Sequence, residues 1–428
     1  MTDSYELDGV RPSRVERPGS VDDLSTTLKK VHEDAQAAVI WGGGTRMHVG
    51  NSVARYDVAV DVTGLDRVVD YRPSDLVVVV EAGITVAALQ EELGKNDQRL
   101  AFDPPAPEKA TIGGSLASNA VGPLRNSYGG VRDLVIGMSV VLADGTLTKS
   151  GGSVVKNVAG YDMARLHIGA FGTLGAIATV AFKIGPLPPA RRTVAAWFDS
   201  VESAAVAGMR IINGAFMPEA ITVIAGPRAA AHASDIAIRT TGDAPENSRG
   251  DAPGTAVLLL VALAASPATV ERQVNDTTST MGGAMADGFA VLDGDQQEAA
   301  WALAAEPDPS PALTVRSTLK PASAFDLVDT LAGAVGPNDI HIVGHVGFGT
   351  VEAHWTADAA SVPGLIESAR TAVRDAGGAF SIERCPAGLK RGLDVFGEIG
   401  APLEIMRRMK QQFDPDGTLS PGRFAGRI

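Results

Sequence analysis

Three glycine-rich segments within the first 190 residues constrain the fold of this chain more than any other feature. In the first segment, an apolar run that reads as a β-strand, Ala37–Trp41, leads into three consecutive glycines, Gly42, Gly43 and Gly44. Glycine adopts positive φ angles and lets another group approach the backbone closely. Successive N–H groups in such a turn can form a concave nest for an anion such as a diphosphate. Alone, this pattern fits a strand connection without a ligand equally well.

Two familiar nucleotide-binding motifs do not fit the first segment. The fingerprint of the dinucleotide-binding Rossmann fold needs a glycine where Met47 stands and a helix directly afterwards. The residues Val49-Gly50-Asn51-Ser52 continue a helix poorly. A phosphate-binding P-loop needs Gly-Lys-Ser/Thr, which is absent. Nicotinamide-dependent enzymes and nucleoside triphosphatases are therefore disfavoured.

The second and third segments add specificity that the first one lacks. In Ala110–Asn119 every residue is small except Ile112 and Leu116. Small side chains leave room for a flat ring system, and the polar ones can hydrogen-bond to it; tight helix packing without a ligand is the alternative. The third segment joins Lys156-Asn157-Val158-Ala159-Gly160-Tyr161-Asp162 to glycines spaced three apart at 169, 172 and 175, before a strand.

Composition narrows the class of protein. A chain of 428 residues predicts two or three domains. Its single cysteine, Cys385, excludes an intramolecular disulfide and fits a reducing compartment. The acidic N-terminus is no signal peptide, and the longest apolar run, Ala256–Ala265, is about half of the ~20 residues that a membrane span needs. The net charge of −13 argues against a nucleic-acid partner. We therefore expect a soluble, cytoplasmic protein in which any bound anion is held by local groups.

The pattern along the chain predicts an α+β fold in three parts. We expect residues 1–188 to form a first domain, 189–401 a second α+β domain and 402–428 a short segment that returns to the first domain. Gly185 to Pro189 reads as a linker because proline cannot donate to a sheet. Residues 226–254 read as a long mobile loop. The predicted helices are Ser20–Val31, Thr85–Leu93, Val201–Ile212, Pro267–Met281, Ala322–Leu331 and Val362–Ala376. The predicted strands are Asp57–Thr63, Leu76–Glu81, Leu134–Leu142, Ala176–Ile184, Ala220–Ala225, Ala256–Ala264 and Ile340–Val346.

Taken in order, the three glycine-rich segments resemble a known family. They are similar to the FAD-binding domain of the vanillyl-alcohol oxidase and p-cresol methylhydroxylase superfamily, and more narrowly to the FAD-binding subunit of bacterial glycolate oxidase. The ending Phe413-Asp414-Pro415 with Pro421-Gly422 also fits. The resemblance covers residues 37–188 and the last 25 residues. It implies a two-subdomain FAD-binding domain of the p-cresol methylhydroxylase type, an α+β cap domain and a C-terminal return segment.

The resemblance also implies which residues hold FAD. The first segment would wrap the pyrophosphate, the second would line the pyrophosphate and ribityl chain, and Ile177 would offer backbone hydrogen bonds near the ring edges. Relatives that bind FAD covalently carry a His where Gly44-Thr45 stand here, so we expect non-covalent binding. The implied FAD-binding residues are Gly42, Gly43, Gly44, Thr45, Arg46, Met47, Thr111, Gly113, Gly114, Ser115, Ser118, Asn119 and Ile177.

Oxidation of a 2-hydroxy acid needs a hydride acceptor, a base for the hydroxyl proton and a cation for the carboxylate. Arginine suits the carboxylate because its planar fork binds both oxygens. Arg316 resembles an arginine on a strand of the family's cap domain, and His345 is the candidate base. Catalytic relatives carry Gly-His-Ala-Gly-Asp-Gly-Asn-Leu-His. Here Phe348, Thr350 and Glu352 replace its Asp, Asn and second His, so we predict no metal site.

The sequence leaves two functions open, and a third is less favoured. The first is an FAD-dependent 2-hydroxy-acid dehydrogenase subunit, with glycolate as the preferred substrate and hydride transfer to flavin N5. The second is an accessory or electron-relay flavin subunit of such an enzyme. The third is a stand-alone flavin dehydrogenase for D-lactate or a sugar acid. The resemblance implies a second flavin subunit and an iron–sulfur subunit as partners, which could hold the chain at the inner face of a membrane. One cysteine cannot hold a Cys-ligated cluster.

Overall fold

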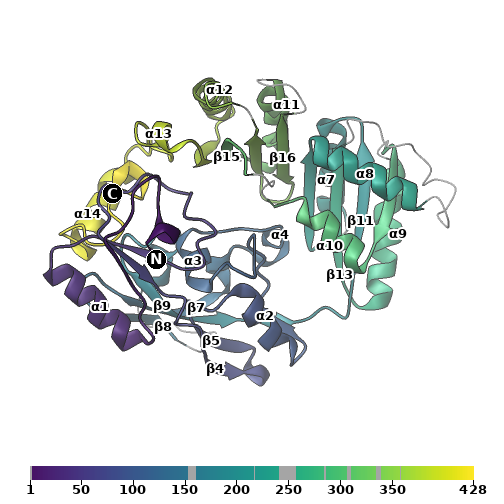
Figure 1. Cartoon of the computed structure of the whole chain (residues 1–428). Helices are drawn as coiled ribbons and strands as arrows, with labels where there is room; N and C mark the ends of the chain where they lie inside the picture. Colours follow the sequence, from purple (N-terminus) through teal and green to yellow (C-terminus); the bar gives the residue numbers. More distant parts are fainter. Residues whose placement is uncertain are drawn as a thin grey trace. The chain divides into compact units, whose positions relative to one another are not determined.

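The chain divides into two compact units (Figure 1). The computed structural model describes residues 2–152, 161–215, 217–240, 257–283, 286–305, 310–333, 339–356 and 358–428. Lys156 to Gly160 of the third glycine-rich segment therefore lie outside the described residues. Unit 1 comprises Met1–Gly122, Tyr128–Leu187 and Ala387–Ile428, and unit 2 comprises Pro123–Ser127 and Pro188–Pro386. Both units combine helices with sheets, so the predicted α+β class is confirmed.

A small parallel sheet in unit 1 ends where the first glycine-rich segment begins. Its order is β1-β3-β2, with β1 at Arg14–Glu16, β3 at Val58–Asp61 and β2 at Ala38–Trp41. Helix α1 (Val21–Glu33) starts at Ser20, whose side chain accepts a hydrogen bond from Asp23 N–H, as the sequence predicted. The apolar face of α1 shares a buried core with residues of β2 and β3. The turn that follows β2 therefore begins at the end of a buried strand.

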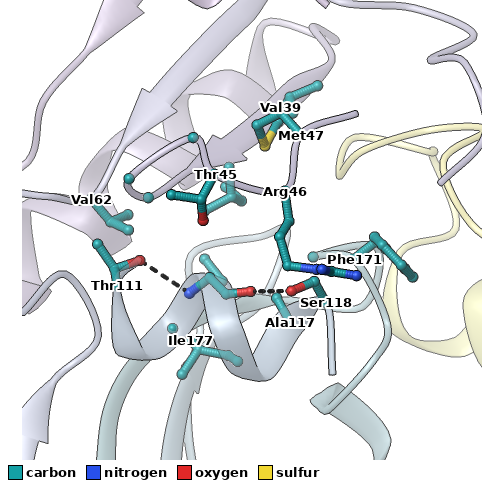
Figure 2. A pocket seen from close by; sticks show the side chains of 18 of the residues that line it. Val39, Thr45, Arg46, Met47, Val62, Thr111, Ala117, Ser118, Phe171 and Ile177 are labelled. Atoms are coloured by element: carbon teal, nitrogen blue, oxygen red, sulfur yellow. Dashed lines mark hydrogen bonds between the residues drawn. The ribbon is translucent and has the colours of Figure 1, made fainter. Parts of the chain in front are cut away.

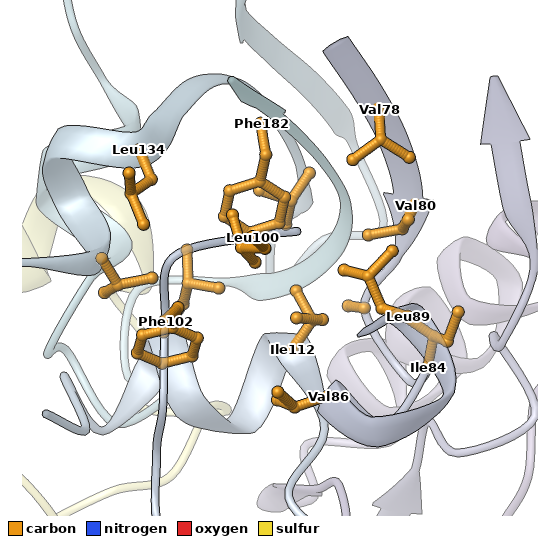
Figure 3. Close-up of a cluster of buried hydrophobic side chains, with 14 of the residues drawn as sticks. Val78, Val80, Ile84, Val86, Leu89, Leu100, Phe102, Ile112, Leu134 and Phe182 are labelled. Carbon is orange, nitrogen blue, oxygen red and sulfur yellow. The ribbon is translucent and has the colours of Figure 1, made fainter. Parts of the chain in front are cut away.

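A five-stranded antiparallel sheet forms the larger part of unit 1. Its order is β4-β5-β9-β7-β8. Helices α2 (Val86–Gly94) and α3 (Ile112–Ala117) contribute to the same core, in which Val80, Leu89, Ile112 and Phe182 are fully buried (Figure 3). The strands are β4 at Val68–Arg72, β5 at Val77–Glu81, β9 at Ala176–Lys183, β7 at Val135–Val141 and β8 at Leu147–Gly151. The shorter elements of unit 1 are η1 Asp3–Tyr5, η2 Pro73–Asp75, β6 Gln98–Arg99, α5 Val131–Leu134, α6 Ala164–His167 and β10 Gly185–Pro186. The short helix α4 at Arg125–Tyr128 lies mostly in Pro123–Ser127, which belongs to unit 2.

The C-terminal residues return to unit 1 and extend its parallel sheet. The N–H of Ala38 in β2 donates to the Thr418 carbonyl at 2.7 Å, and Ser420 N–H donates to the Ala38 carbonyl at 2.7 Å. The last elements are α13 at Ala387–Lys390, α14 at Pro402–Phe413 and η5 at Ala425–Arg427. The end of the chain therefore lies beside the strand that leads into Gly42.

Unit 2 is built on one antiparallel sheet of eight strands. Its order is β14-β11-β13-β12-β16-β17-β15-β18. The strands are β11 Ala190–Phe198, β12 Ala220–Ala225, β13 Val257–Ala265, β14 Gly288–Leu292, β15 Leu313–Thr318, β16 Ile340–His345, β17 Thr350–Trp355 and β18 Ala379–Arg384. The helices are α7 Val201–Ile212, α8 Pro227–Thr240, α9 Pro267–Gly283, α10 Gly294–Ala302, η4 Pro321–Ser323, α11 Asp326–Gly333 and α12 Val362–Asp375.

Three sequence predictions need correction. Most of the first half of the predicted loop 226–254 is helix α8, because Ala229, Ala233 and Ile236 bury one face against the sheet core. The helix predicted at 322–331 starts later, at Asp326, after the separate 3₁₀ turn η4. Gly185–Pro186 in the predicted linker is the short strand β10, paired with β6. The chain passes from unit 1 to unit 2 just after it, between Leu187 and Pro188.

Candidate functional site

A pocket in unit 1 gathers the first two glycine-rich segments and the end of the third. The space between its lining residues, part of it open to solvent, is about 780 Å³. Figure 2 shows Thr45, Thr111 and Ile177 around it, with Arg46 reaching toward Ser118 and Phe171. The predicted residues that line it are Gly42, Gly43, Gly44, Thr45, Arg46, Met47, Thr111, Gly113, Gly114, Ser118 and Ile177.

Close backbone packing explains the glycines of the first two segments. A Cβ atom on Gly43 would lie 1.5 Å from the Lys109 carbonyl oxygen, and one on Gly42 would lie 2.2 Å from Thr111 Oγ1. Gly44 has a φ of +73°, which L side chains rarely adopt. The turn after β2 therefore packs directly against the start of α3, and a side chain would separate the two.

Backbone amides of the turn are available to a ligand. Within the described part of the chain, the N–H groups of Gly43, Gly44 and Thr45 donate no hydrogen bond. The first N–H groups of α3 differ: Gly113 N–H donates to the Ala82 carbonyl at 2.7 Å, and Gly114 N–H donates to Thr111 Oγ1 at 3.2 Å. Because polar backbone groups need partners, the turn is the part of this pocket best suited to hold an anion.

Two of the predicted FAD-binding residues, Ser115 and Asn119, do not line the pocket. Ser115 is buried in α3, and its carbonyl accepts a hydrogen bond from Ala120 N–H at 2.9 Å. Asn119 follows the helix with a φ of +47°, a conformation that asparagine tolerates better than most residues. Neither is among the residues that line the pocket. They shape the end of α3, whereas Ser118 lines the pocket and donates its hydroxyl to the Gly114 carbonyl at 2.8 Å.

Among the lining residues that the sequence analysis did not assign to the site, three carry an aromatic or charged side chain: His167, Phe171 and Arg423. His167 is 5% exposed, its Nδ1 has no hydrogen-bond partner among the described residues, and burial lowers its pKa to about 4. It is therefore neutral at pH 7. Arg423 is 2% exposed and comes from the returning C-terminal segment. No local motif links Arg423 to the turn after β2, because the contact depends on the tertiary fold.

The predicted carboxylate anchor, Arg316, lies in unit 2 and is already paired. Its Nη2 is 2.8 Å from Glu352 Oε1 and 3.0 Å from Glu383 Oε1, and its Nε also donates to Glu352. Burial alone would lower the pKa of Arg316, but the charges of Glu383 and Glu352 raise it. The antiparallel register of β15, β17 and β18 brings these three side chains together. A substrate carboxylate would have to compete with two glutamates.

The predicted base, His345, is buried in unit 2 beside an aromatic ring. Its ring stacks on Phe348 with centroids 4.7 Å apart, and its Nδ1 lies 3.0 Å from Thr222 Oγ1. Burial is the main cause that lowers its pKa to about 4, so the ring is neutral at pH 7. No hydrogen bond joins His345 to Arg316 among the described residues, but the charge of Arg316 is one of the smaller causes that lower the pKa of His345. Among the described residues, no group of three His, Cys, Asp or Glu side chains is arranged to hold a metal ion.

Comparison with known proteins identifies the family. A family model described as the FAD binding domain matches residues 12–151. A second, described as the C-terminal domain of FAD linked oxidases, matches residues 187–376 and 398–424, which is more than half of the chain. The chain belongs to the FAD-linked oxidases.

Relatives of this FAD-linked oxidase include subunits of one enzyme. It is 25% identical to glycolate oxidase subunit GlcD of Bacillus subtilis over 96% of this chain and 89% of that protein. It is 35% identical to glycolate oxidase subunit GlcE of Escherichia coli, over only 39% of this chain and 47% of that protein. A solved structure of alkyldihydroxyacetonephosphate synthase shares the fold, with a TM-score of 0.69 at 17% identity over 95% of this chain and 76% of that one.

The unit 1 pocket fits the cofactor of the FAD-linked oxidases. An FAD molecule carries a diphosphate, which suits the amides of the turn after β2 and the buried cation of Arg423. It also carries flat rings, which suit the small residues of α3. In the part of the chain that the structure covers, no helix has the length and apolar character needed to span a membrane.

Proposed function

We propose that unit 1 binds one FAD non-covalently, with its diphosphate at the turn formed by Gly42 to Met47, and that unit 2 is the cap that receives the substrate. The single observation that carries this proposal is that Gly43, Gly44 and Thr45 line the pocket and that, among the described residues, their N–H groups donate no hydrogen bond. Residues 387–428 are part of unit 1 and so belong to the proposed FAD-binding unit. His167 is the one histidine among the described residues that line the pocket. A flavin bound covalently to a side chain would stay attached in acid, so release of the flavin by acid tests non-covalent binding directly.

The reaction that we propose is oxidation of a small 2-hydroxy acid, with glycolate preferred. This proposal rests on the similarity to glycolate oxidase subunits. When bound, FAD would supply N5 as the hydride acceptor. The chain would have to supply a cation for the carboxylate and a base for the hydroxyl proton, for which Arg316 and the neutral imidazole of His345 are the candidates in unit 2.

A second candidate, an accessory or electron-relay flavin subunit, is favoured by one specific observation. The guanidinium of Arg316 is neutralised by two glutamates, whose side chains are 16% and 8% exposed. Removing charge from a partly buried ion cluster is costly, so the cluster is a stable structural unit as it stands. A chain with this cluster could bind FAD while a related partner oxidises the substrate.

Anaerobic reduction of the bound flavin separates the two candidates. We expect glycolate to bleach the flavin of the purified chain if this chain is catalytic, with D-lactate as a comparison substrate. A flavin that stays oxidised until partner subunits are added supports the accessory role. Arg316→Lys keeps the charge but loses the two-pronged fork. If Arg316 anchors the substrate carboxylate, this variant raises the glycolate concentration needed for bleaching, whereas unchanged bleaching removes that assignment.

The partners that we propose are a second flavin subunit and an iron–sulfur subunit. The similarity to two different glycolate oxidase subunits supports a multi-subunit enzyme. With Cys385 as its one cysteine, this chain has no set of thiolates for a cluster. Electrons would therefore leave the flavin toward a partner, in the cytoplasm or at the inner face of a membrane to which the partners attach. Co-purification of the tagged chain with both subunits tests this assembly.

A further inference from the structure

Arg423 is a deeply buried cation that has no carboxylate partner among the described residues. Its side chain lines the unit 1 pocket, and the residue is 2% exposed. Within the described part of the chain, no carboxylate oxygen lies within 4.0 Å of its guanidinium. Asp8 is the acid whose charge raises the pKa of Arg423, against the larger effect of burial that lowers it to about 10. Asp8 is itself paired with Lys390 at 3.0 Å.

The hydrogen bonds of Arg423 leave part of its donor capacity unused. Nη2 donates to the carbonyls of Val49 at 2.7 Å and Met47 at 3.1 Å, and Nη1 donates to the Asn51 carbonyl at 3.2 Å. A guanidinium has five N–H donors, and these contacts use three. The other two donate no hydrogen bond to the described residues. Carbonyl oxygens solvate the cation in part but carry no net charge to balance it.

A buried charge is stable when an opposite charge accompanies it. The protein has a net charge of −13, so its overall field repels a diphosphate and local cations must attract it. Arg423 is placed to do so, because it contacts the backbone that continues the turn after β2 and lines the same pocket as the free amides of Gly43 to Thr45.

We propose that Arg423 binds the diphosphate of FAD and acts as its counter-ion in the unit 1 pocket. This assignment rests on the proposed binding of FAD to unit 1. It gives the C-terminal return segment a role in ligand binding. A planar fork suits a diphosphate because it can donate two N–H groups to phosphate oxygens.

Flavins with and without phosphate test this assignment. The binding of FAD, FMN and riboflavin to apoprotein would be measured by fluorescence quenching for wild type, Arg423→Met and Arg423→Lys. We expect Arg423→Met to weaken FAD and FMN binding by about 10- to 100-fold and to leave riboflavin binding within about 3-fold. Inorganic pyrophosphate should raise the melting temperature of wild-type apoprotein and not that of Arg423→Met.

Arg427→Met is the matched control. Arg427 also holds three backbone carbonyls, those of Lys390, Arg391 and Leu393, but it does not line the pocket. The control should bind every flavin like wild type. If Arg423→Met does not fold, Arg423→Lys carries the test: it should weaken FAD and FMN more than riboflavin while pyrophosphate still stabilises it.

Two results would overturn the assignment. Wild-type affinity of the Arg423 variants for FAD and pyrophosphate would show that the cation does not meet the phosphates. An equal loss for FAD, FMN and riboflavin would show that Arg423 only shapes the loop 47–51. Failure of the proposed function looks different, because wild-type protein would then bind no flavin at all. Stabilisation of that wild type by pyrophosphate, dependent on Arg423, would keep the anion site and reject FAD as its ligand.

Discussion

At the scale of single residues, the pocket depends on the absence of side chains as much as on their presence. The φ angle of Gly43 is not positive, so its backbone conformation does not itself require glycine. A Cβ atom on Gly43 would, however, lie 1.5 Å from the Lys109 carbonyl oxygen. Any larger residue must push the turn away from the start of α3. The amides at Gly43 to Thr45 would then no longer converge on one ligand.

Replacing Gly43 by Ala should therefore weaken FAD binding strongly. We expect at least a tenfold loss, which corresponds to about 1.4 kcal/mol of binding free energy. A fluorescence titration of apoprotein with FAD measures it. Gly94→Ala at the end of α2 is the control, because a Cβ there meets nothing within 4 Å. Equal affinity of Gly43→Ala and wild type would contradict the packing argument.

Three of the buried histidines in the described part of the chain make the folded state sensitive to acid. Burial is the largest cause that lowers the pKa of each of them. The pKa is about 4 for His167, about 3 for His341 and about 4 for His345. An unfolded histidine titrates near ~6.5. As the pH falls below that value, the unfolded state therefore binds protons that the folded state does not.

We expect the free energy of unfolding to fall between pH 6.5 and 4, by about 1–2 kcal/mol for each of these histidines on going from pH 7 to pH 5. Urea unfolding at the two pH values measures the difference. His345→Gln should reduce it, while His32→Gln at a partly exposed helix position serves as the control. A stability that does not change over this range, or that rises toward acid, would refute the prediction.

At the scale of elements, one buried carboxylate holds together the turn of the C-terminal segment whose backbone bonds to β2. Asp414 is 1% exposed and accepts hydrogen bonds from the N–H groups of Thr418 at 2.9 Å and Leu419 at 2.7 Å. Its Oδ2 also pairs with Lys410 Nζ at 2.6 Å. Lys410 in turn donates to the Thr173 carbonyl at 2.8 Å, next to pocket residues of the third glycine-rich segment.

Asp414→Ala should destabilise unit 1 by about 3 kcal/mol or more, since it removes the acceptor of two N–H groups and the charge partner of Lys410, which keeps only carbonyl acceptors. Thermal unfolding of apoprotein measures the loss. Asp416→Ala in the same turn is the control, because that side chain is 69% exposed, and it should stay within about 0.5 kcal/mol of wild type. A comparably small effect of Asp414→Ala would contradict the role of this turn.

The elements also show what the sequence could and could not predict. Helix α7 was predicted with the same bounds, Val201–Ile212, since its apolar residues recur at helical spacing. Helix α8 was missed because its buried face consists mainly of alanines, which look neutral in a sequence. The glycine-rich turn was predicted because its chemistry is local. The contacts of Arg423 and the glutamates around Arg316 were missed because long-range packing and strand register create them.

At the scale of the whole molecule, the chain consists of two units with separate sheets and separate cores. The residues that line the pocket proposed to hold FAD all belong to unit 1. A ligand that binds only the folded state stabilises it by about 2.7 kcal/mol when present at 100 times its dissociation constant. If the units unfold separately, this stabilisation belongs to unit 1 alone.

Scanning calorimetry should therefore show two transitions, of which FAD raises only one. Asp414→Ala should lower the transition that responds to FAD, and Arg316→Met should lower the other one, because the two residues lie in different units. A single transition that shifts as a whole would contradict the separation, since it would mean that the two units unfold together.

The most direct test of the account is the binding of FAD to the purified chain. Apoprotein prepared by acid treatment would be titrated with FAD, and the bound flavin would be counted by its visible absorbance after gel filtration. We predict one FAD per chain, released again by acid. Protein that stays colourless after this treatment and shows no affinity for FAD would contradict the central claim.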